Sequence, residues 1–194
     1  MDIKNWKESP GILKIRERLE DQKIKSSMKW IFEILVTLVF AAVVALMMFQ
    51  TVTMQESSME PTISVGDRFF INKAVYKFSS PKRGDLIVFR SNASDDAALH
   101  IRRVIGLPGE KVQIKDGKVY INDSEIPLDD SFVPEKPRGS FGPYEVPENS
   151  YFVLGDNRNH SKDSRCWKST SFVTFDEIVG KAVIRYYPSV KLLK

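Results

Sequence analysis

The sequence predicts an all-β domain, either a sandwich or an open barrel, preceded by one membrane-spanning helix. From Ile34 to Phe49 the chain carries no charged residue. Together with the residues just before it, this apolar run is long enough to cross about 30 Å of hydrocarbon as a helix. Residues 53–194 then show several short apolar segments separated by turn residues, with little helical pattern, which is typical of sandwiches and barrels.

The N-terminal part divides into a basic tail, residues 1–29, and an apolar segment, residues 30–52. The tail has eight Lys/Arg against five Asp/Glu, and the next basic residue after it is Arg68. The positive-inside rule therefore predicts a cytoplasmic tail, with residues 53–194 outside. No small-x-small motif follows the apolar segment, so we expect an uncleaved anchor rather than a secretory signal. The tail itself fits either a weak amphipathic helix on the membrane or a solvated segment.

Short strand-like segments fill the remainder of the chain. In residues 111–122, apolar and polar residues alternate around Asp116 and Gly117, a strong signal of a two-residue hairpin turn. The turn-rich stretch 134–150 and the polar segment 91–96 are expected to be loops. The other expected strands are RFFIN (68–72), LIVFR (86–90), HIRRVIGL (100–107), YFVLGD (151–156) and KAVIRYYP (181–188).

Composition excludes several classes of protein. Cys166 is the only cysteine, so no internal disulfide can form. With His100 and His160 as the only histidines, and neither HExxH nor CxxC, we expect no metal site and no cofactor. Residues 51–194 carry 21 Lys/Arg against 19 Asp/Glu, whereas a nucleic-acid-binding domain of this size usually has a basic body.

Two adjacent serines, Ser57 and Ser58, follow the apolar segment closely. A serine becomes nucleophilic only when a neighbouring group removes its proton, most often a histidine oriented by a carboxylate. Neither His100 nor His160 lies in a pattern that would complete such a triad. The residues alone therefore fit an ordinary turn, or a helix start with Pro61 near its first position.

Four motifs, taken together, point instead to a peptidase. SSMEPT (57–62) resembles the nucleophile motif S-M-x-P-T of type I signal peptidases, and RGDLIVF (83–89) is similar to the next motif of that family. RRVIGLPGEKVQI (102–114) resembles the motif of the general base, K-R-V-x-G-x-P-G-[DE]. YFVLGDNRNHSKDSR (151–165) resembles the last motif, G-D-N-x-x-x-S-x-D-S-R. The motifs follow the family's order, after an N-terminal anchor, and cover most of residues 54–188. The chain thus resembles the type I signal peptidase (leader peptidase) family.

This resemblance implies a fold and a set of site residues. The fold would be a compact domain of two antiparallel sheets. Ser58 would be the nucleophile, with its backbone N–H in the oxyanion hole, and Ser161 would steady the base. The resemblance further assigns Met59, Ile63 and Ile101 to an apolar substrate pocket, Asp163 and Arg165 to a supporting pair, and Gly155, Asp156 and Asn157 to the loop that brings them near. Met59 and Ile63 also fit a plain core, and Asp163 with Arg165 a surface ion pair worth under about 1 kcal/mol.

The family's base is a lysine, and this chain has Arg102 in that position. Burial can lower the pKa of a lysine from about 10.4 far enough for it to accept a proton. Arginine stays protonated in proteins. Arg102 is therefore expected to favour a Ser58 alkoxide by its charge, or to hold a water. His100 is the alternative base, since it lies two residues earlier and would face the same side of a strand.

Glu56 is a second departure from the family pattern. It lies two residues before Ser58, where some family members have a hydroxyl that helps to bind the oxyanion. An ionised glutamate there would repel developing negative charge. It could also pair with Arg102 and give a closed, inert site.

The function that the resemblance implies is a membrane-bound serine endopeptidase that removes signal peptides from exported preproteins after a small-x-small sequence. Expected partners are preprotein signal peptides, membrane lipid and the secretion machinery. The expected location is the cytoplasmic membrane, as a single-pass protein, with a thylakoid-type membrane as the alternative. Two other functions stay open: a catalytically silent relative that binds signal peptides or a partner peptidase, which Arg102 favours, and a membrane-anchored β module without a peptide groove.

Overall fold

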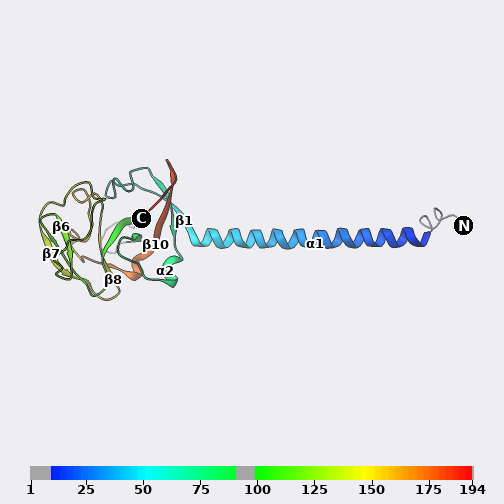
Figure 1. Cartoon of the computed structure of the whole chain (residues 1–194), viewed down its shortest axis with the longest axis horizontal. Helices are drawn as coiled ribbons and strands as arrows, with labels where there is room; N and C mark the ends of the chain where they lie inside the picture. The colour runs from blue at the N-terminus through cyan, green and yellow to red at the C-terminus, as the bar shows by residue number, and fades with distance from the viewer. Residues whose placement is uncertain (1–9, 91–98, 194) are drawn as a thin grey trace. The chain divides into compact units, whose positions relative to one another are not determined.

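The computed structural model describes residues 10–90 and 99–193, and the chain divides into two units, residues 1–47 and 48–194. Figure 1 shows the chain coloured from the N-terminus to the C-terminus and labels both helices and several of the strands. The loop expected at residues 91–96 lies outside the described residues.

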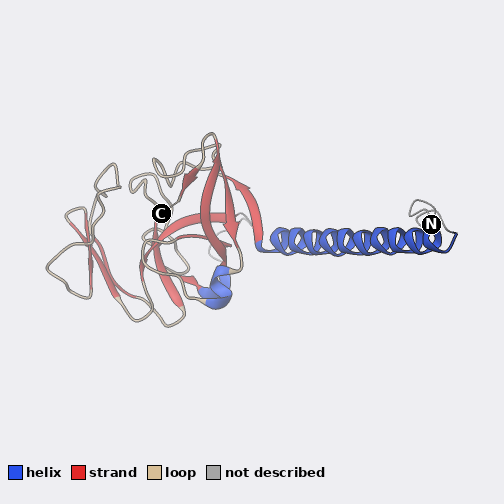
Figure 2. Ribbon diagram, turned by 45° about the vertical axis from the view of Figure 1, so that its right-hand side comes forward, coloured by secondary structure: helices blue, strands red, loops and turns tan. Residues whose placement is uncertain are grey.

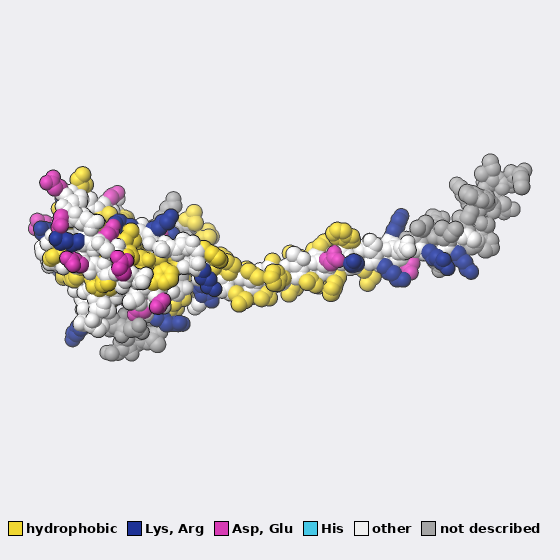
Figure 3. All heavy atoms as spheres, turned by 90° about the horizontal axis from the view of Figure 1, so that it is seen from below, with side chains coloured by type: hydrophobic (Ala, Val, Ile, Leu, Met, Phe, Trp, Pro, Cys, Tyr) yellow, Lys and Arg dark blue, Asp and Glu magenta, His cyan; other side chains and the backbone are white. Residues whose placement is uncertain are grey.

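The first unit is formed by α1 (Pro10–Met48), one continuous helix of 39 residues. Proline suits the first turn of a helix, and neither glycine nor proline interrupts the chain from Ile12 to Met48. The expected boundary at residue 29 is therefore not a helix boundary, and the helix ends before residue 52. By length and composition, the part of α1 from Asp21 onward could cross a membrane. Figure 3 shows hydrophobic side chains along this part and Lys and Arg towards the N-terminus.

The second unit consists of two antiparallel sheets, which confirms the predicted fold class (Figure 2). The larger sheet has the order β1-β2-β10-β3-β4-β8-β9, with β11 paired to β10, and the smaller sheet has the order β6-β5-β7. The elements are β1 (Phe49–Thr53), β2 (Arg68–Asn72), α2 (Val75–Phe78), β3 (Leu86–Arg90), β4 (Leu99–Gly106), β5 (Lys111–Lys115), β6 (Lys118–Ile121), β7 (Phe141–Glu145), β8 (Ser150–Leu154), β9 (Val173–Thr174), a 3-10 turn (Phe175–Glu177), β10 (Ile178–Tyr187) and β11 (Lys191–Leu192).

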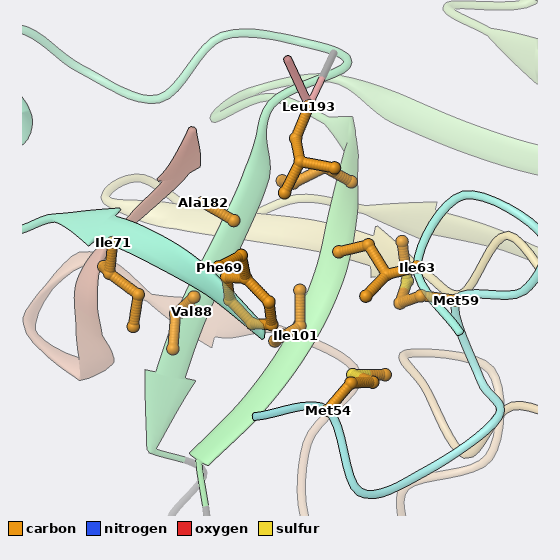
Figure 4. Close-up of a cluster of buried hydrophobic side chains, with 10 residues drawn as sticks. Met54, Met59, Ile63, Phe69, Ile71, Val88, Ile101, Ala182 and Leu193 are labelled. Carbon is orange, nitrogen blue, oxygen red and sulfur yellow. The ribbon is translucent and has the colours of Figure 1, made fainter. Parts of the chain in front are cut away.

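The central strand β3 of the larger sheet is buried on both faces. Along β3, Leu86 and Val88 belong to one apolar cluster, whereas Ile87 and Phe89 belong to another, as the two-residue period of a strand requires. Figure 4 shows the first cluster, in which side chains of β2, β3 and β4 meet those of the loop after β1. A strand that is covered on both faces needs an unbroken apolar sequence, as LIVFR provides.

The smaller sheet contains the predicted hairpin. Asp116 and Gly117 connect β5 to β6 and have φ values of 51° and 70°, as the residues of a type I′ turn require. β7 lies within residues 134–150, which were expected to be loop only. Its Pro143 is tolerated because β7 is an edge strand, paired with β5 alone in the described sheet.

Candidate active site

Ser58 lies in the loop that joins β1 to β2, and its side chain is 2% exposed. The neighbouring Met59 and Ile63 are fully buried in the cluster of Figure 4 and anchor the loop. The backbone N–H of Asn157 donates to the Ser58 carbonyl at 3.0 Å, and the Asn157 side-chain amide donates to the Ser57 carbonyl at 3.1 Å. The expected nucleophile is therefore fixed from its apolar side and from the loop of the last motif.

Arg102 places its guanidinium against the Ser58 hydroxyl. This side chain belongs to β4 and is 1% exposed. Nη1 donates to Ser58 Oγ at 2.8 Å and to Glu56 Oε1 at 2.6 Å, while Nη2 donates to Glu56 Oε2 at 3.4 Å. Nε and Nη2 also donate to the Lys162 carbonyl, at 3.2 and 2.7 Å. Arg102 and Glu56 thus form an ion pair beside the candidate nucleophile.

Glu56 receives hydrogen bonds from several directions. Burial would raise the pKa of its carboxyl, but hydrogen bonds from His100 and Arg102, the positive charge of Arg102 and a hydrogen bond with Ser58 outweigh it, and the pKa falls to about 2. His100 Nδ1 lies 3.9 Å from Glu56 Oε1. His100 and Arg102 therefore reach the same carboxylate, as expected for residues two apart on a strand, and Glu56 is ionised at every working pH.

The last motif lies directly behind this group. A Cβ atom on Gly155 would clash with Ser161 Oγ and come within 2.5 Å of the Ser58 carbonyl oxygen, so only glycine fits there. Ser161 Oγ is buried and has no hydrogen-bond partner among the described residues. Arg102 does not bond to Ser161 Oγ but donates to the backbone carbonyl of the next residue, Lys162.

Asp163 and Arg165 form a buried pair, so their interpretation as a surface ion pair is wrong. Their side chains are 0% and 4% exposed. Asp163 accepts from Arg165 Nε at 2.8 Å and Nη2 at 2.7 Å, and its Oδ2 also accepts from the Gly155 N–H at 3.0 Å. Burial would lower the pKa of Arg165, but the contact with Asp163 outweighs this and raises it. The pair thus braces the Gly155 turn that contacts the Ser58 loop.

A second buried network ties the nucleophile loop to β4, and the sequence did not reveal it. Arg103 donates to Asp156 Oδ1 at 2.8 Å and Oδ2 at 2.6 Å, and Thr62 Oγ1 donates to Asp156 Oδ2 at 2.6 Å. Only Asp156 had been singled out, as part of a loop. One feature of the sequence could have indicated this network: Thr62, Arg103 and Asp156 belong to three different motifs of the family, and the network brings these motifs together.

A cavity of about 550 Å³ opens beside Glu56. The three residues assigned to a substrate pocket all belong to the core cluster, and of these Ile101 also lines the cavity. The cavity is lined by Val52, Thr53, Met54, Gln55, Glu56, Leu99, His100 and Ile101. It therefore lies between the end of β1 and the start of β4.

We expect Asp163→Asn to lower the free energy of unfolding by about 3–5 kcal/mol, because it leaves the buried Arg165 charge without its counter-ion. The measurement is urea unfolding of the full chain in detergent. Lys111→Met is the matched control, since it breaks the Lys111–Asp123 pair, whose side chains are 36% and 67% exposed, and should cost under about 1 kcal/mol. Equal losses in the two variants would contradict the bracing role of Asp163.

Comparison with known proteins places these features in a family. The sequence model of the family described as "Signal peptidase, peptidase S26" matches residues 27–187. The chain is 40% identical to "Signal peptidase I" of Leptolyngbya laminosa over 142 residues, which cover 70% of this chain and 67% of that protein. It is 33% identical to "Signal peptidase I T" of Bacillus subtilis (strain 168) over 180 residues, 89% of this chain and 91% of that one. A crystal structure of a signal peptidase I from Enterococcus faecalis V583 is 32% identical, with a TM-score of 0.44, covering 53% of this chain and 97% of that chain.

Proposed function

Because the chain belongs to the signal peptidase family, peptidase S26, we propose that it cleaves N-terminal signal peptides from exported preproteins with Ser58 as the nucleophile. The observation that carries this proposal is the position of the Ser58 hydroxyl. It is buried against the positive charge of Arg102. Glu56, which forms an ion pair with Arg102, lines the cavity. A serine oxygen beside a cation is favoured as an alkoxide.

The substrate would bind as an added strand. β4 pairs with β3 along residues 99–103 and with β8 from Arg103 onward. Leu99, His100 and Ile101 line the cavity, and the end of β1 lines it from the other side. An extended peptide there can hydrogen-bond to the backbone while alternate side chains enter pockets. This arrangement supports recognition of small residues at the first and third positions before the cut, which the family resemblance implies.

The reaction would pass through an acyl-enzyme. Ser58 Oγ attacks the scissile carbonyl, the amide C–N bond breaks, and water then releases the acyl group from Ser58. Arg102 stays charged throughout and offsets negative charge on Oγ, 2.8 Å from Nη1. Asp163, Arg165 and Ser161 would act indirectly, through the turn that supports the Ser58 loop.

The chain would be anchored as a single-pass protein of the cytoplasmic membrane. The proposed parts are a tail at residues 1–29, a membrane segment in residues 30–52, whose helix ends at Met48, and a peptidase domain at residues 53–194. The apolar α1 and the eight basic residues before the membrane segment support this orientation, with the domain outside. Membrane lipid and the secretion machinery would then be the partners beside the preprotein itself.

The test uses the full chain in lipid vesicles with a precursor that has alanine at the first and third positions before the expected cut. We expect cleavage at that single bond, and at least about tenfold slower cleavage of a precursor with leucine at the first position, because the family resemblance implies that only small side chains are accepted there. Cleavage at scattered sites, or indifference to the leucine, would contradict the proposal.

A second candidate function is binding of signal peptides without cleavage. The ion pair between Arg102 and Glu56 favours it, because both charges are already satisfied beside the nucleophile. The same vesicle assay separates the two functions. A precursor that co-sediments with the protein and stays intact would identify a binding protein.

A further inference from the structure

Ser58 needs a proton acceptor, and the group at the base position cannot supply one. A guanidinium has only hydrogen-bond donors and stays protonated in proteins. Ser161, the hydroxyl expected to steady a base, is buried and has no partner among the described residues. Arg102 bonds instead to the Lys162 carbonyl and to Glu56. The proton of Ser58 must therefore go elsewhere.

Glu56 is an acceptor that binds the same nitrogen of Arg102 as this hydroxyl. Arg102 Nη1 donates to Ser58 Oγ at 2.8 Å and to Glu56 Oε1 at 2.6 Å, so one nitrogen holds both oxygens side by side. Contact with Ser58 is among the causes that lower the pKa of Glu56. A guanidinium only donates hydrogen bonds, whereas an ionised carboxylate only accepts them, so of these two groups only Glu56 can take the hydroxyl proton.

We propose that Glu56 is the general base for Ser58 and that Arg102 is their shared, fixed counter-charge; this rests on the proposed function. As Oγ bonds to the substrate carbonyl carbon, the hydroxyl proton passes to Glu56. Protonated Glu56 then gives that proton to the leaving amine as the C–N bond breaks. In the second half, Glu56 takes a proton from water as the water oxygen bonds to the acyl carbon, and the proton returns to Ser58 Oγ as the ester bond breaks.

Arg102 weakens Glu56 as a base, but it also favours the alkoxide form of the neighbouring Ser58. Before the step the negative charge is on Glu56; as Oγ bonds to the carbonyl carbon and its proton passes to Glu56, the charge moves to the substrate carbonyl oxygen. Arg102 Nη1 contacts both Glu56 and Oγ, so its charge is close to both ends of this transfer. Repulsion between Glu56 and the developing oxyanion, expected from the sequence, is removed because Glu56 becomes neutral as that charge forms.

Glu56 can also reach the leaving group. Its side chain is 42% exposed and lines the cavity in which the substrate strand would lie. Arg102, by contrast, is 1% exposed and cannot deliver a proton. His100 contacts Glu56, 3.9 Å from Nδ1 to Oε1, so in this arrangement it orients the carboxylate.

The test is Glu56→Gln in the full chain, assayed in vesicles against a preprotein beside wild type and Ser58→Ala. We expect kcat/KM to fall at least about 100-fold, the usual contribution of a general base, with KM nearly unchanged. Glu110→Gln is the matched control. It removes the carboxylate charge of another Arg–Glu pair, Arg83–Glu110, and should leave cleavage within about twofold.

The pH profile gives an independent readout. Because Glu56 is ionised well below neutral pH, kcat/KM of the wild type should stay level between about pH 5 and 8. A profile that rises with pH within this range, or only above pH 8, would assign the base to a different group; either result would overturn the proposal. If Glu56→Gln fails to fold, as judged by its circular dichroism, the cleavage rate of Glu56→Asp is measured instead. This variant keeps the charge but shortens the reach, so we expect at least a tenfold loss, and full activity would be contrary to the proposal.

The outcomes distinguish a failure of the role proposed for Glu56 from a failure of the proposed function. Wild-type cleavage that is lost in both Ser58→Ala and Glu56→Gln supports both. Cleavage that is lost in Ser58→Ala but retained in Glu56→Gln overturns the role of Glu56 and leaves the proposed function standing. A wild type that does not cleave at all overturns the proposed function, and with it the inference.

Discussion

Ser58→Ala is expected to abolish preprotein cleavage, with kcat/KM reduced at least about 1,000-fold, because removing a nucleophile leaves only the catalysis that binding and oxyanion stabilisation provide. The measurement is the rate of product formation by the full chain in vesicles. The chain offers a closely matched control in Ser57→Ala, which removes the adjacent hydroxyl. Only the backbone carbonyl of Ser57 contacts Asn157, so this variant should keep cleavage within about threefold.

Two results would count against the assignment. If Ser58→Ala and Ser57→Ala lose activity equally, the loop and not the Ser58 oxygen is what matters. If neither variant changes cleavage, or if Ser58→Ala changes only the stability of a chain that cleaves nothing, the domain is a membrane-anchored β module rather than a serine peptidase.

Arg102→Lys combined with Glu56→Ala is expected to raise kcat/KM at least about tenfold above wild type. A lysine amine at this position is a stronger base than a carboxylate, and burial lowers its pKa towards the working pH. Ser161 Oγ, which lacks a partner among the described residues, is then available to the amine. The gain should appear as pH rises and the lysine loses its proton, in contrast to the level profile expected for wild type.

The single variant Arg102→Lys is the informative comparison. With Glu56 still present, the new ammonium has a carboxylate beside it, which favours its charged form and raises its pKa. We therefore expect little gain from Arg102→Lys alone. Removing the Glu56 carboxylate should thus lower activity in the wild-type background and raise it in the Arg102→Lys background. A folded double variant with no more activity than the single one would refute this dependence on the partner.

The strands were predictable because their sequences carry local patterns. RFFIN and LIVFR form β2 and β3 with the expected bounds, and the Asp116–Gly117 turn follows from its backbone requirement for positive φ. β1 was missed because Phe49–Thr53 continues the apolar run of α1. It is a strand only through its pairing with β2, which lies fifteen or more residues later in the chain. Such tertiary pairing overrides local propensity.

The sequence proposes members for the candidate site but not their contacts. Its motifs single out Ser58, Arg102, Ser161 and Asp163, whose roles stay predictions, and it left open whether Glu56 pairs with Arg102. It does, because the loop after β1 lies against β4. The burial of Asp163 with Arg165 was also hidden, since two residues separated by one position give no sign of what covers them.

Measuring the mass of the enzyme during turnover tests most directly whether Ser58 is the nucleophile. The full chain in detergent is mixed with a peptide ester whose acyl part ends in alanine, quenched in acid and digested, and the modified peptide is identified by mass spectrometry. We expect an acyl group on Ser58 in the wild type and none in Ser58→Ala. An acyl group on a different residue, or turnover of the ester by Ser58→Ala at the wild-type rate, would contradict this expectation.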